Sequence, residues 1–253
     1  TFIVLSLVVL AVFCSPLQAR RGRPFTGPKY VFYFIGDGMA LPQIHSTEAY
    51  LQFSVDPDNP TGNYDDPEAL DTGLIDDGNL LTMSRFPVVG LQRTYANNRF
   101  ITGSAASATA LACGKKTTIN TIAMDSDKVN PYATIAELCQ AKNMKVGVVS
   151  SVSIDHATPA CFYAHQPERG NYWEIANELS LSDFDYFAGG GPKGQRSKYW
   201  PAGATDPVQR AIDRGYTVVR TKAELAAVTP GTKTFAYGND VYTEGANPTD
   251  KSY

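Results

Sequence analysis

The run Met144-Lys145-Val146-Gly147-Val148-Val149-Ser150 has the composition of a buried β-strand. Its apolar residues are mostly β-branched, as is typical of strands in the interior of a parallel sheet. A polar cluster at residues 151–158 follows the carboxyl end of this run, and Pro159 then suits the first turn of a helix. The stretch therefore predicts a βα unit whose polar residues lie where open α/β sheets place their sites.

Alternating strand and helix signals continue on both sides of this unit. We expect strands at residues 30–35, 88–95, 184–187, 216–219 and 233–237. We expect helices at residues 40–51, 105–112, 131–142, 172–181, 206–214 and 222–228. Residues 56–79 are rich in Asp, Asn, Pro and Gly and predict a long surface excursion. The pattern predicts one α/β domain with a largely parallel sheet covered by helices.

The first predicted strand stops abruptly at Gly36-Asp37-Gly38. Glycines on both sides let the backbone turn while the Asp37 carboxylate faces a ligand. An Asp-Gly hairpin is the alternative, but the helical pattern that follows disfavours it.

A second candidate is Ser104, in a run of small residues at 101–110. Gly103 lets the backbone bend, and Ser104 then stands at the start of a helix, where unpaired N–H groups favour anions. This placement suits a nucleophile, whereas small residues alone also mark close helix packing. The later sequence Gly114-Lys115-Lys116-Thr117 lacks the spacing of a phosphate-binding Walker loop and is better interpreted as a helix stop.

Taken together, these motifs resemble the alkaline phosphatase family over about residues 29–191. The resemblance rests on Gly36-Asp37-Gly38-Met39, on the run from Ser104 to Thr109, on His156-Ala157-Thr158-Pro159 and on Arg169, in this order. It implies a three-layer alkaline-phosphatase-like fold, with a largely parallel central sheet flanked by helices.

The resemblance also implies roles for individual residues. Ser104 matches the serine that attacks phosphorus, and Arg169 matches the guanidinium that clamps two phosphate oxygens. Asp37 matches a carboxylate that bridges a zinc and the magnesium ion, and Thr158 matches a magnesium ligand. His156 stands where family members have aspartate or histidine, and an imidazole there suits zinc or a water-mediated contact better than magnesium.

The cofactors implied are two Zn²⁺ ions and one Mg²⁺ ion, with Asp37, Ser104, Thr158 and His156 as the metal-contacting residues. Taken alone, Thr158 could equally cap the helix that begins near Pro159, and Arg169 could be a surface arginine. Nothing after Gly191 supplies the further His and Asp ligands that the family uses for zinc, so we expect this chain alone to be inactive, as the N-terminal part of a longer catalytic domain. Some family members carry aspartate in place of Gly103, and its absence here predicts a looser clamp on Arg169.

The predicted activity is hydrolysis of small phosphate monoesters through a phosphoserine. A phosphodiesterase or sulfatase of the same superfamily is one alternative, and a non-catalytic exported protein that binds phosphate or metal through a degenerate site is another. Charge disfavours nucleic acid as the main partner, since 22 Lys and Arg residues are balanced by 25 Asp and Glu residues.

Residues 1–19 predict a signal peptide without its start. The apolar run at 2–13 is too short to span a bilayer, and a peptidase site follows Ala19. We therefore expect export to the periplasm or the extracellular space, and a mature chain, 20–253, with no membrane span. The cysteines left, Cys113, Cys139 and Cys161, are as compatible with buried free thiols as with one disulfide. The resemblance further implies a homodimer.

Overall fold

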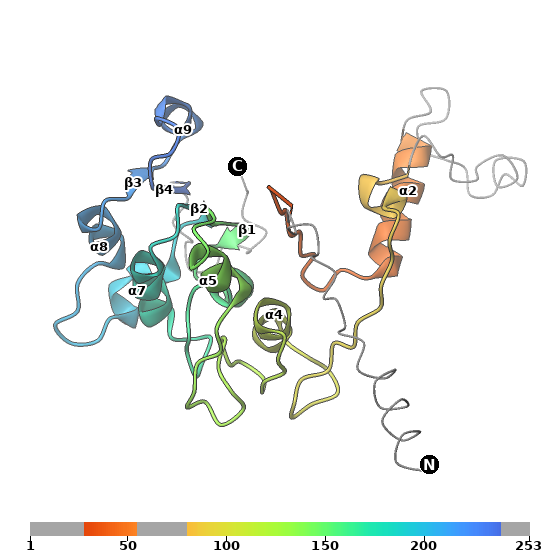
Figure 1. Ribbon diagram of the computed structural model, residues 1–253, viewed down its shortest axis with the longest axis horizontal. Coiled ribbons are helices and arrows are strands. Elements are labelled where there is room, and N and C mark those ends of the chain that lie inside the picture. Colours follow the sequence, from red (N-terminus) through yellow and green to blue (C-terminus); the bar gives the residue numbers. More distant parts are fainter. Residues whose placement is uncertain (1–27, 55–79, 239–253) are drawn as a thin grey trace, which may run out of the picture. The chain divides into compact units, whose positions relative to one another are not determined.

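The computed structural model describes residues 28–54 and 80–238 (Figure 1). The predicted signal peptide and the predicted excursion at 56–79 lie outside these ranges. The chain forms two compact units, Thr1–Gly36 and Asp37–Tyr253.

In the first unit, residues 28–36 form neither helix nor strand. The predicted strand at 30–35 is therefore wrong in this structure, and most of its side chains are exposed, Phe32 by 80% and Phe34 by 86%. A strand forms only through hydrogen bonds to a neighbouring backbone, and an apolar composition does not supply that neighbour.

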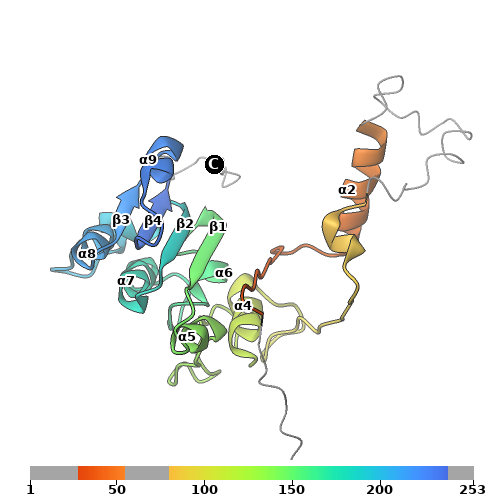
Figure 2. The same cartoon turned by 45° about the horizontal axis from the view of Figure 1, so that its top comes forward.

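The second unit contains a four-stranded, entirely parallel sheet (Figure 2). Its strands are β1 (Gly147–Ser153), β2 (Tyr186–Gly190), β3 (Thr217–Val219) and β4 (Thr234–Tyr237), in the order β1-β2-β4-β3. The predicted parallel sheet is thus confirmed. However, β1 lies at an edge and Val149 is 69% exposed, so this strand is less buried than its sequence predicts.

Aromatic side chains form the core beside the sheet. The Phe187 ring on β2 packs edge to face against Tyr163 at 5.2 Å between centroids and also contacts Phe184 and Phe235. Helix α7 (Tyr172–Ser182) buries Ile175 and Leu179, and it packs against α8 (Pro207–Asp213). Burial of these large apolar groups is the main stabilising contribution to the fold.

Capping residues account for several helix boundaries. Helix α4 (Ser104–Cys113) begins after Gly103 and ends at Gly114, whose φ of 67° is the left-handed conformation that glycine adopts readily. Asp206 caps α8 by accepting a hydrogen bond from the Val208 N–H, and Thr221 with Glu224 forms a capping box on α9 (Lys222–Ala227). The other helices are α2 (Leu41–Ser54), α5 (Ile135–Gln140), α6 (Ala157–Ala160), η1 (Thr82–Arg85), η2 (Lys193–Gln195) and η3 (Ser197–Tyr199).

Two further predictions are wrong. Residues 88–95 form no strand, and Leu91 is 99% exposed. The helix predicted from Asn130-Pro131 begins only at Ile135, because the side chain of Asp125 holds Val129 N–H and the Asn130 amide in a turn. Thr134 and Glu137 then form the capping box that starts α5.

The three cysteines within the described ranges are free thiols. Cys161 is buried, as expected, but Cys113 and Cys139 are only half-buried. Among the helices of residues 28–54 and 80–238, none is both long enough and apolar enough to cross a membrane.

Candidate active site

Ser104 is the first residue of α4 and is half-buried at the helix N-terminus. Gly103 precedes it in an extended conformation, and Ala105 and Ala106 are buried behind it. The small residues thus let α4 pack closely while its first turn remains accessible. Backbone N–H groups without helical partners at such a terminus favour a bound anion.

Asp37 lies beside Ser104 although 67 positions separate them in the sequence. The Ser104 hydroxyl donates a hydrogen bond to Asp37 Oδ2 at 2.9 Å, and the Thr158 hydroxyl donates to the same oxygen at 3.2 Å. Gly38, which follows Asp37, has a φ of 66°, a conformation that favours glycine in this turn. Three residues from distant segments therefore meet at one carboxylate oxygen.

Thr158 lies inside the short helix α6 and is not its cap. The N-cap is His156, and its side chain makes no capping hydrogen bond. The alternative that Thr158 only caps this helix is therefore excluded, because its hydroxyl is directed at Asp37.

His156 and Arg169 form a second pair in the site. Arg169 Nη2 lies 3.0 Å from His156 Nε2. Since a guanidinium can only donate, Nε2 is the acceptor and the ring proton of a neutral His156 is on Nδ1. Burial, the Arg169 guanidinium and the Lys193 ammonium lower the pKa of His156 to about 4, although Asp37 opposes them. The imidazole is therefore neutral near pH 7, and its Nδ1 is buried without a hydrogen-bond partner.

The segment that carries Arg169 is fixed by contacts to two other segments. The Arg169 backbone N–H donates to the Asn120 carbonyl at 2.8 Å, and Ile122 and Gln166 exchange two backbone hydrogen bonds. The His165 ring bridges the Ala123 carbonyl (3.0 Å) and Glu137 Oε1 (2.9 Å). His165 is thus a structural residue, consistent with its omission from the predicted site.

Asp155, Lys193 and Gly194 were not identified from the sequence, yet they border the site. Asp155 is fully buried, and its Oδ2 accepts the Gly194 N–H at 2.7 Å. Burial raises the pKa of Asp155 to about 6, although backbone hydrogen bonds from Gly194 and Lys193 oppose the shift. The bond joins the loop that carries His156 to η2. In the sequence, only the position of Asp155 next to His156 could have suggested that it anchors this loop.

The donor set of the site partly fits the metals that the sequence predicts. Asp37 and the hydroxyls of Ser104 and Thr158 converge as oxygen donors, which is the chemistry that Mg²⁺ prefers. Within the described residues no three His, Cys, Asp or Glu side chains lie close enough together to hold a metal ion. These residues therefore do not by themselves form a zinc site of N, S or carboxylate ligands.

Comparisons with known proteins identify the family of this chain. The family model for alkaline phosphatase matches residues 28–207. Alkaline phosphatase 3 of Bacillus subtilis is 35% identical over 152 residues, covering 59% of this chain and 28% of that protein. The human tissue-nonspecific alkaline phosphatase is 27% identical over 204 residues, covering 70% of this chain and 35% of that protein.

Solved structures show the same relationship. The cold-active alkaline phosphatase of a psychrophilic Shewanella species is 32% identical with a TM-score of 0.60, covering 80% of this chain and 44% of that one. The alkaline phosphatase of the Antarctic bacterium TAB5 is 33% identical with a TM-score of 0.56, covering 61% and 45%. The matches span about a third of the curated relatives' length, between 28% and 39%. The chain belongs to the alkaline phosphatase family.

Proposed function

We propose that the complete protein hydrolyses phosphate monoesters in two steps, with Ser104 as the nucleophile. The observation that carries this proposal is the Ser104 hydroxyl at the N-terminus of α4, hydrogen-bonded to Asp37 at 2.9 Å. Membership of the alkaline phosphatase family supports the same reaction class.

In the first step the Ser104 oxygen attacks phosphorus, and the bond between phosphorus and the ester oxygen breaks. That oxygen leaves with the electron pair and takes a proton from water, and the Ser104 proton, accepted by Asp37 Oδ2, neutralises the hydroxide that remains. Because the Ser104 O–H points at Asp37 Oδ2, the lone pairs of the serine oxygen remain directed elsewhere and can attack. In the second step water attacks the phosphoserine, the Ser104 oxygen leaves and regains a proton, and phosphate is released.

Arg169 and the first turn of α4 would neutralise the charge on the phosphoryl oxygens. A guanidinium binds two such oxygens with parallel N–H donors. The contact of Arg169 Nη2 with His156 Nε2 at 3.0 Å uses one of its five N–H donors, so the others can bind phosphate. Removing one preorganised donor of this kind typically costs about 3 kcal/mol in the transition state.

We propose that Asp37, Ser104, Thr158 and His156 contact the metal ions of the complete protein, two Zn²⁺ and one Mg²⁺. When bound, such ions polarise the phosphoryl oxygens and lower the pKa of a coordinated hydroxyl. A variant of the TAB5 enzyme with aspartate in place of a histidine has Mg bound in its M3 site. By the same oxygen preference, His156→Asp should lower the Mg²⁺ concentration that half-maximally raises the Tm. His156→Asn, without the charge, is the control, and equal Mg²⁺ dependence of both variants would contradict this assignment.

The nucleophile is tested with the complete protein and p-nitrophenyl phosphate. Ser104→Ala should abolish turnover, and rapid quenching of the unaltered protein should yield one phosphoryl group on the peptide that contains Ser104. Ser107→Ala is the matched control, because Ser107 lies one turn along α4 and bonds only to the Gly103 and Ser104 carbonyls. Full turnover by Ser104→Ala would refute the nucleophile.

Assays of the same complete protein distinguish the two alternative functions. A phosphodiesterase or sulfatase would cleave diesters or sulfate esters faster than monoesters. A non-catalytic protein would bind phosphate or metal without turnover of any ester and would contain less than the expected zinc.

We also propose that the protein is exported and forms a homodimer. The apolar run at residues 2–13 followed by a peptidase site after Ala19 supports export. Sequencing the N-terminus of the protein secreted by its own host should give Arg20 as the first residue. Sedimentation of the purified protein should give twice the mass of one chain.

A further inference from the structure

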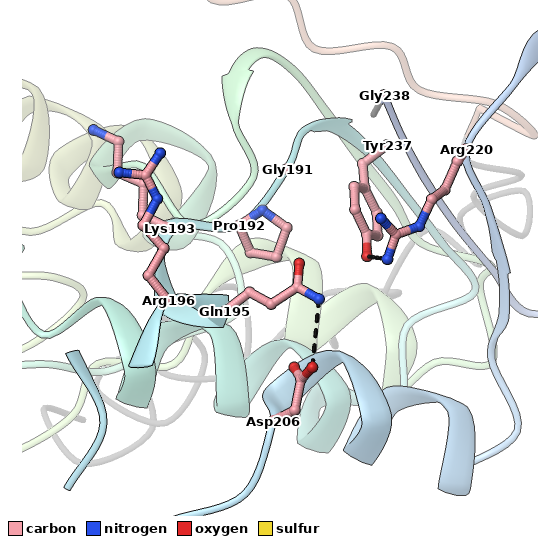
Figure 3. A pocket seen from close by; sticks show the side chains of 9 residues that line it. All are labelled: Gly191, Pro192, Lys193, Gln195, Arg196, Asp206, Arg220, Tyr237 and Gly238. Carbon is pink, nitrogen blue, oxygen red and sulfur yellow. Dashed lines mark hydrogen bonds between the residues drawn. The ribbon is translucent and has the colours of Figure 1, made fainter. Parts of the chain in front are cut away.

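A pocket of about 320 Å³ lies at the carboxyl ends of β2, β3 and β4 (Figure 3). Its lining comes from the segment after β2, from Arg220 after β3, from the end of β4 and from Asp206 at the start of α8. The lining residues are Gly191, Pro192, Lys193, Gln195, Arg196, Asp206, Arg220, Tyr237 and Gly238. The carboxyl edge of a parallel sheet is where α/β proteins bind ligands.

The pocket is lined by three cationic side chains and one carboxylate. The cationic residues are Lys193, Arg196 and Arg220. The carboxylate, Asp206, already accepts the Val208 N–H at 2.8 Å, and the Gln195 amide lies 3.4 Å from its other oxygen. A guanidinium in the wall of a pocket, such as that of Arg220, favours an anionic ligand.

Arg220 is held in place before any ligand binds. Its Nη2 donates to the Tyr237 hydroxyl at 2.6 Å, and its guanidinium carbon lies 4.6 Å from the centre of the Tyr237 ring. Figure 3 shows Arg220 and Tyr237 together on one side of the pocket, across from Pro192 and Gln195, whereas the charged ends of Lys193 and Arg196 extend away from them. A guanidinium has five N–H donors, and the bond to Tyr237 uses one of them. An arginine oriented in this way loses little side-chain entropy when it binds an anion.

This pocket and the Ser104 site lie along the same edge of the sheet. β1 and β2 are neighbouring parallel strands. The segment after β1 is bonded to the end of β2 through Ile154 N–H and the Gly190 carbonyl (3.1 Å), and to the segment after β2 through Asp155 Oδ2 and Gly194 N–H (2.7 Å). Lys193, which lines the pocket, is next to Gly194 in η2. The loop that carries His156 and Thr158 is therefore attached directly to the pocket wall.

We propose that this pocket binds a second anionic group of the substrate, so that the protein prefers phosphate monoesters whose alcohol part carries a further phosphate or carboxylate. The inference rests on the proposed function, because it assigns a substrate class to the Ser104 site.

The preference is measured on the complete protein with two series of substrates. One series consists of alkyl monophosphates, and the other of the α,ω-bisphosphates of the same chain length. Scanning the chain length finds the spacing that reaches the pocket. At the best length we expect kcat/KM for the bisphosphate to exceed that for the monophosphate by about tenfold or more, as for a charge-assisted hydrogen-bonded pair.

Substitution of Arg220 should remove the preference. In Arg220→Gln the ratio of the two kcat/KM values should fall close to one, and Tyr237→Phe, which removes the hydroxyl that orients Arg220, should lower it in part. Arg210→Gln is the matched control, because it removes the same charge from the neighbouring helix α8 without lining the pocket. The ratio in this control should equal that of the unaltered protein.

Several results would overturn the inference. An unchanged ratio in Arg220→Gln, or an equal loss in Arg210→Gln, would show that the pocket does not bind the second anion. If the pocket instead holds free phosphate, Arg220→Gln would weaken inhibition by inorganic phosphate equally for both series, with no bisphosphate preference.

Calorimetry separates this inference from the proposed reaction. Binding of the bisphosphate to Ser104→Ala should be tighter than binding of the monophosphate and should depend on Arg220. If no ester is turned over, the proposed function fails, whereas the pocket is still tested by this binding. Equal affinities for the two ligands would refute the pocket assignment alone.

Discussion

Arg169 Nη2 donates to His156 Nε2 at 3.0 Å, so the guanidinium proposed to bind phosphate is held by a neighbouring side chain. The imidazole is neutral because burial, Arg169 and Lys193 lower the pKa of His156 to about 4. A phosphate ion and the His156 lone pair therefore compete for the same guanidinium.

This competition predicts a change at His156 when phosphate binds. Inorganic phosphate should draw Arg169 away from Nε2, because a guanidinium bonds a phosphate dianion more strongly than a neutral imidazole. The ¹⁵N resonance of His156 Nε2, assigned with His156→Gln, should then shift on phosphate titration. In Arg169→Ala the same titration should leave this resonance unmoved. A shift of equal size in that variant would mean that phosphate acts on His156 directly.

Gly194 should be intolerant of any side chain. A Cβ at this position would lie 2.1 Å from the Tyr172 carbonyl oxygen and 2.8 Å from the Ala176 Cβ. Because the obstacle is backbone and a packed helix, Gly194→Ala should destabilise the protein by about 1–3 kcal/mol or more, as overpacking does. Thermal unfolding measures the loss. Gly170→Ala, where a Cβ meets nothing within 4 Å, is the control and should keep the Tm of the unaltered protein.

The same substitution should also weaken activity in the folded fraction. Gly194 N–H holds Asp155, and Asp155 precedes His156. Displacement of η2 therefore moves the loop of the proposed site. We expect kcat to be lower than in the unaltered protein even at temperatures below the Tm, where the variant is folded. An unchanged kcat with a lowered Tm would limit Gly194 to a structural role.

Helix boundaries were the part of the fold that local sequence could predict. Gly103, Gly114, Asp206 and the Thr221 capping box act through neighbours within four residues, so their effect does not depend on the rest of the chain. The capping box of Thr134 and Glu137 was present in the sequence but was missed, since Asn130-Pro131 gave a stronger start signal.

Strand pairing could not be predicted in the same way. Residues 30–35 and 88–95 have strand-like composition, yet pairing depends on segments far away in the sequence. The placement of β4 between β2 and β3 is likewise a property of the whole sheet. The meeting of Asp37, Ser104 and Thr158 was expected only through the family resemblance, because no local pattern joins positions so far apart.

The ion pair of His165 and Glu137 should make stability depend on pH. Burial alone would lower the pKa of His165, but hydrogen bonds to Glu137 and the Ala123 carbonyl and the charges of Glu137 and Glu178 raise it above 6.5. Burial would raise the pKa of Glu137, but its bonds to His165 and Thr134 lower it below 4.5.

The sign follows from these two directions. The His165 contribution is fully present below its unfolded pKa of 6.5 and is lost as the pH rises through the higher folded pKa. The Glu137 contribution is present above its unfolded pKa of 4.5 and is lost as the pH falls through the lower folded pKa. The pair therefore stabilises most between these two unfolded values. Burial raises the pKa of Glu178, so this residue favours the folded protein at low pH, where it is protonated. Its contribution to the pH dependence is therefore opposite in sign to that of Glu137.

Accordingly, His165→Gln should lower the Tm more at about pH 5.5 than at about pH 9. His45→Gln, at an exposed position of α2, is the control and should show a smaller dependence on pH. A Tm difference for His165→Gln that is the same at both pH values would exclude a charged pair.

We expect glycine at position 103 to leave Arg169 less firmly held when phosphate is bound than aspartate would. At this position φ is −127° and a Cβ would meet only Ile119 Cδ1, at 3.8 Å, so a larger residue fits without strain. Aspartate here would cap α4 and place a negative charge before Ser104, where it can orient the Arg169 guanidinium. Gly103→Asp should therefore strengthen inhibition by inorganic phosphate and slow its release, with kcat falling if release limits turnover. Gly103→Asn has the same shape and capping ability without the charge, so it should leave phosphate inhibition near that of the unaltered protein. An unchanged inhibition constant in Gly103→Asp, or an equal change in both variants, would show that the missing carboxylate does not loosen the clamp.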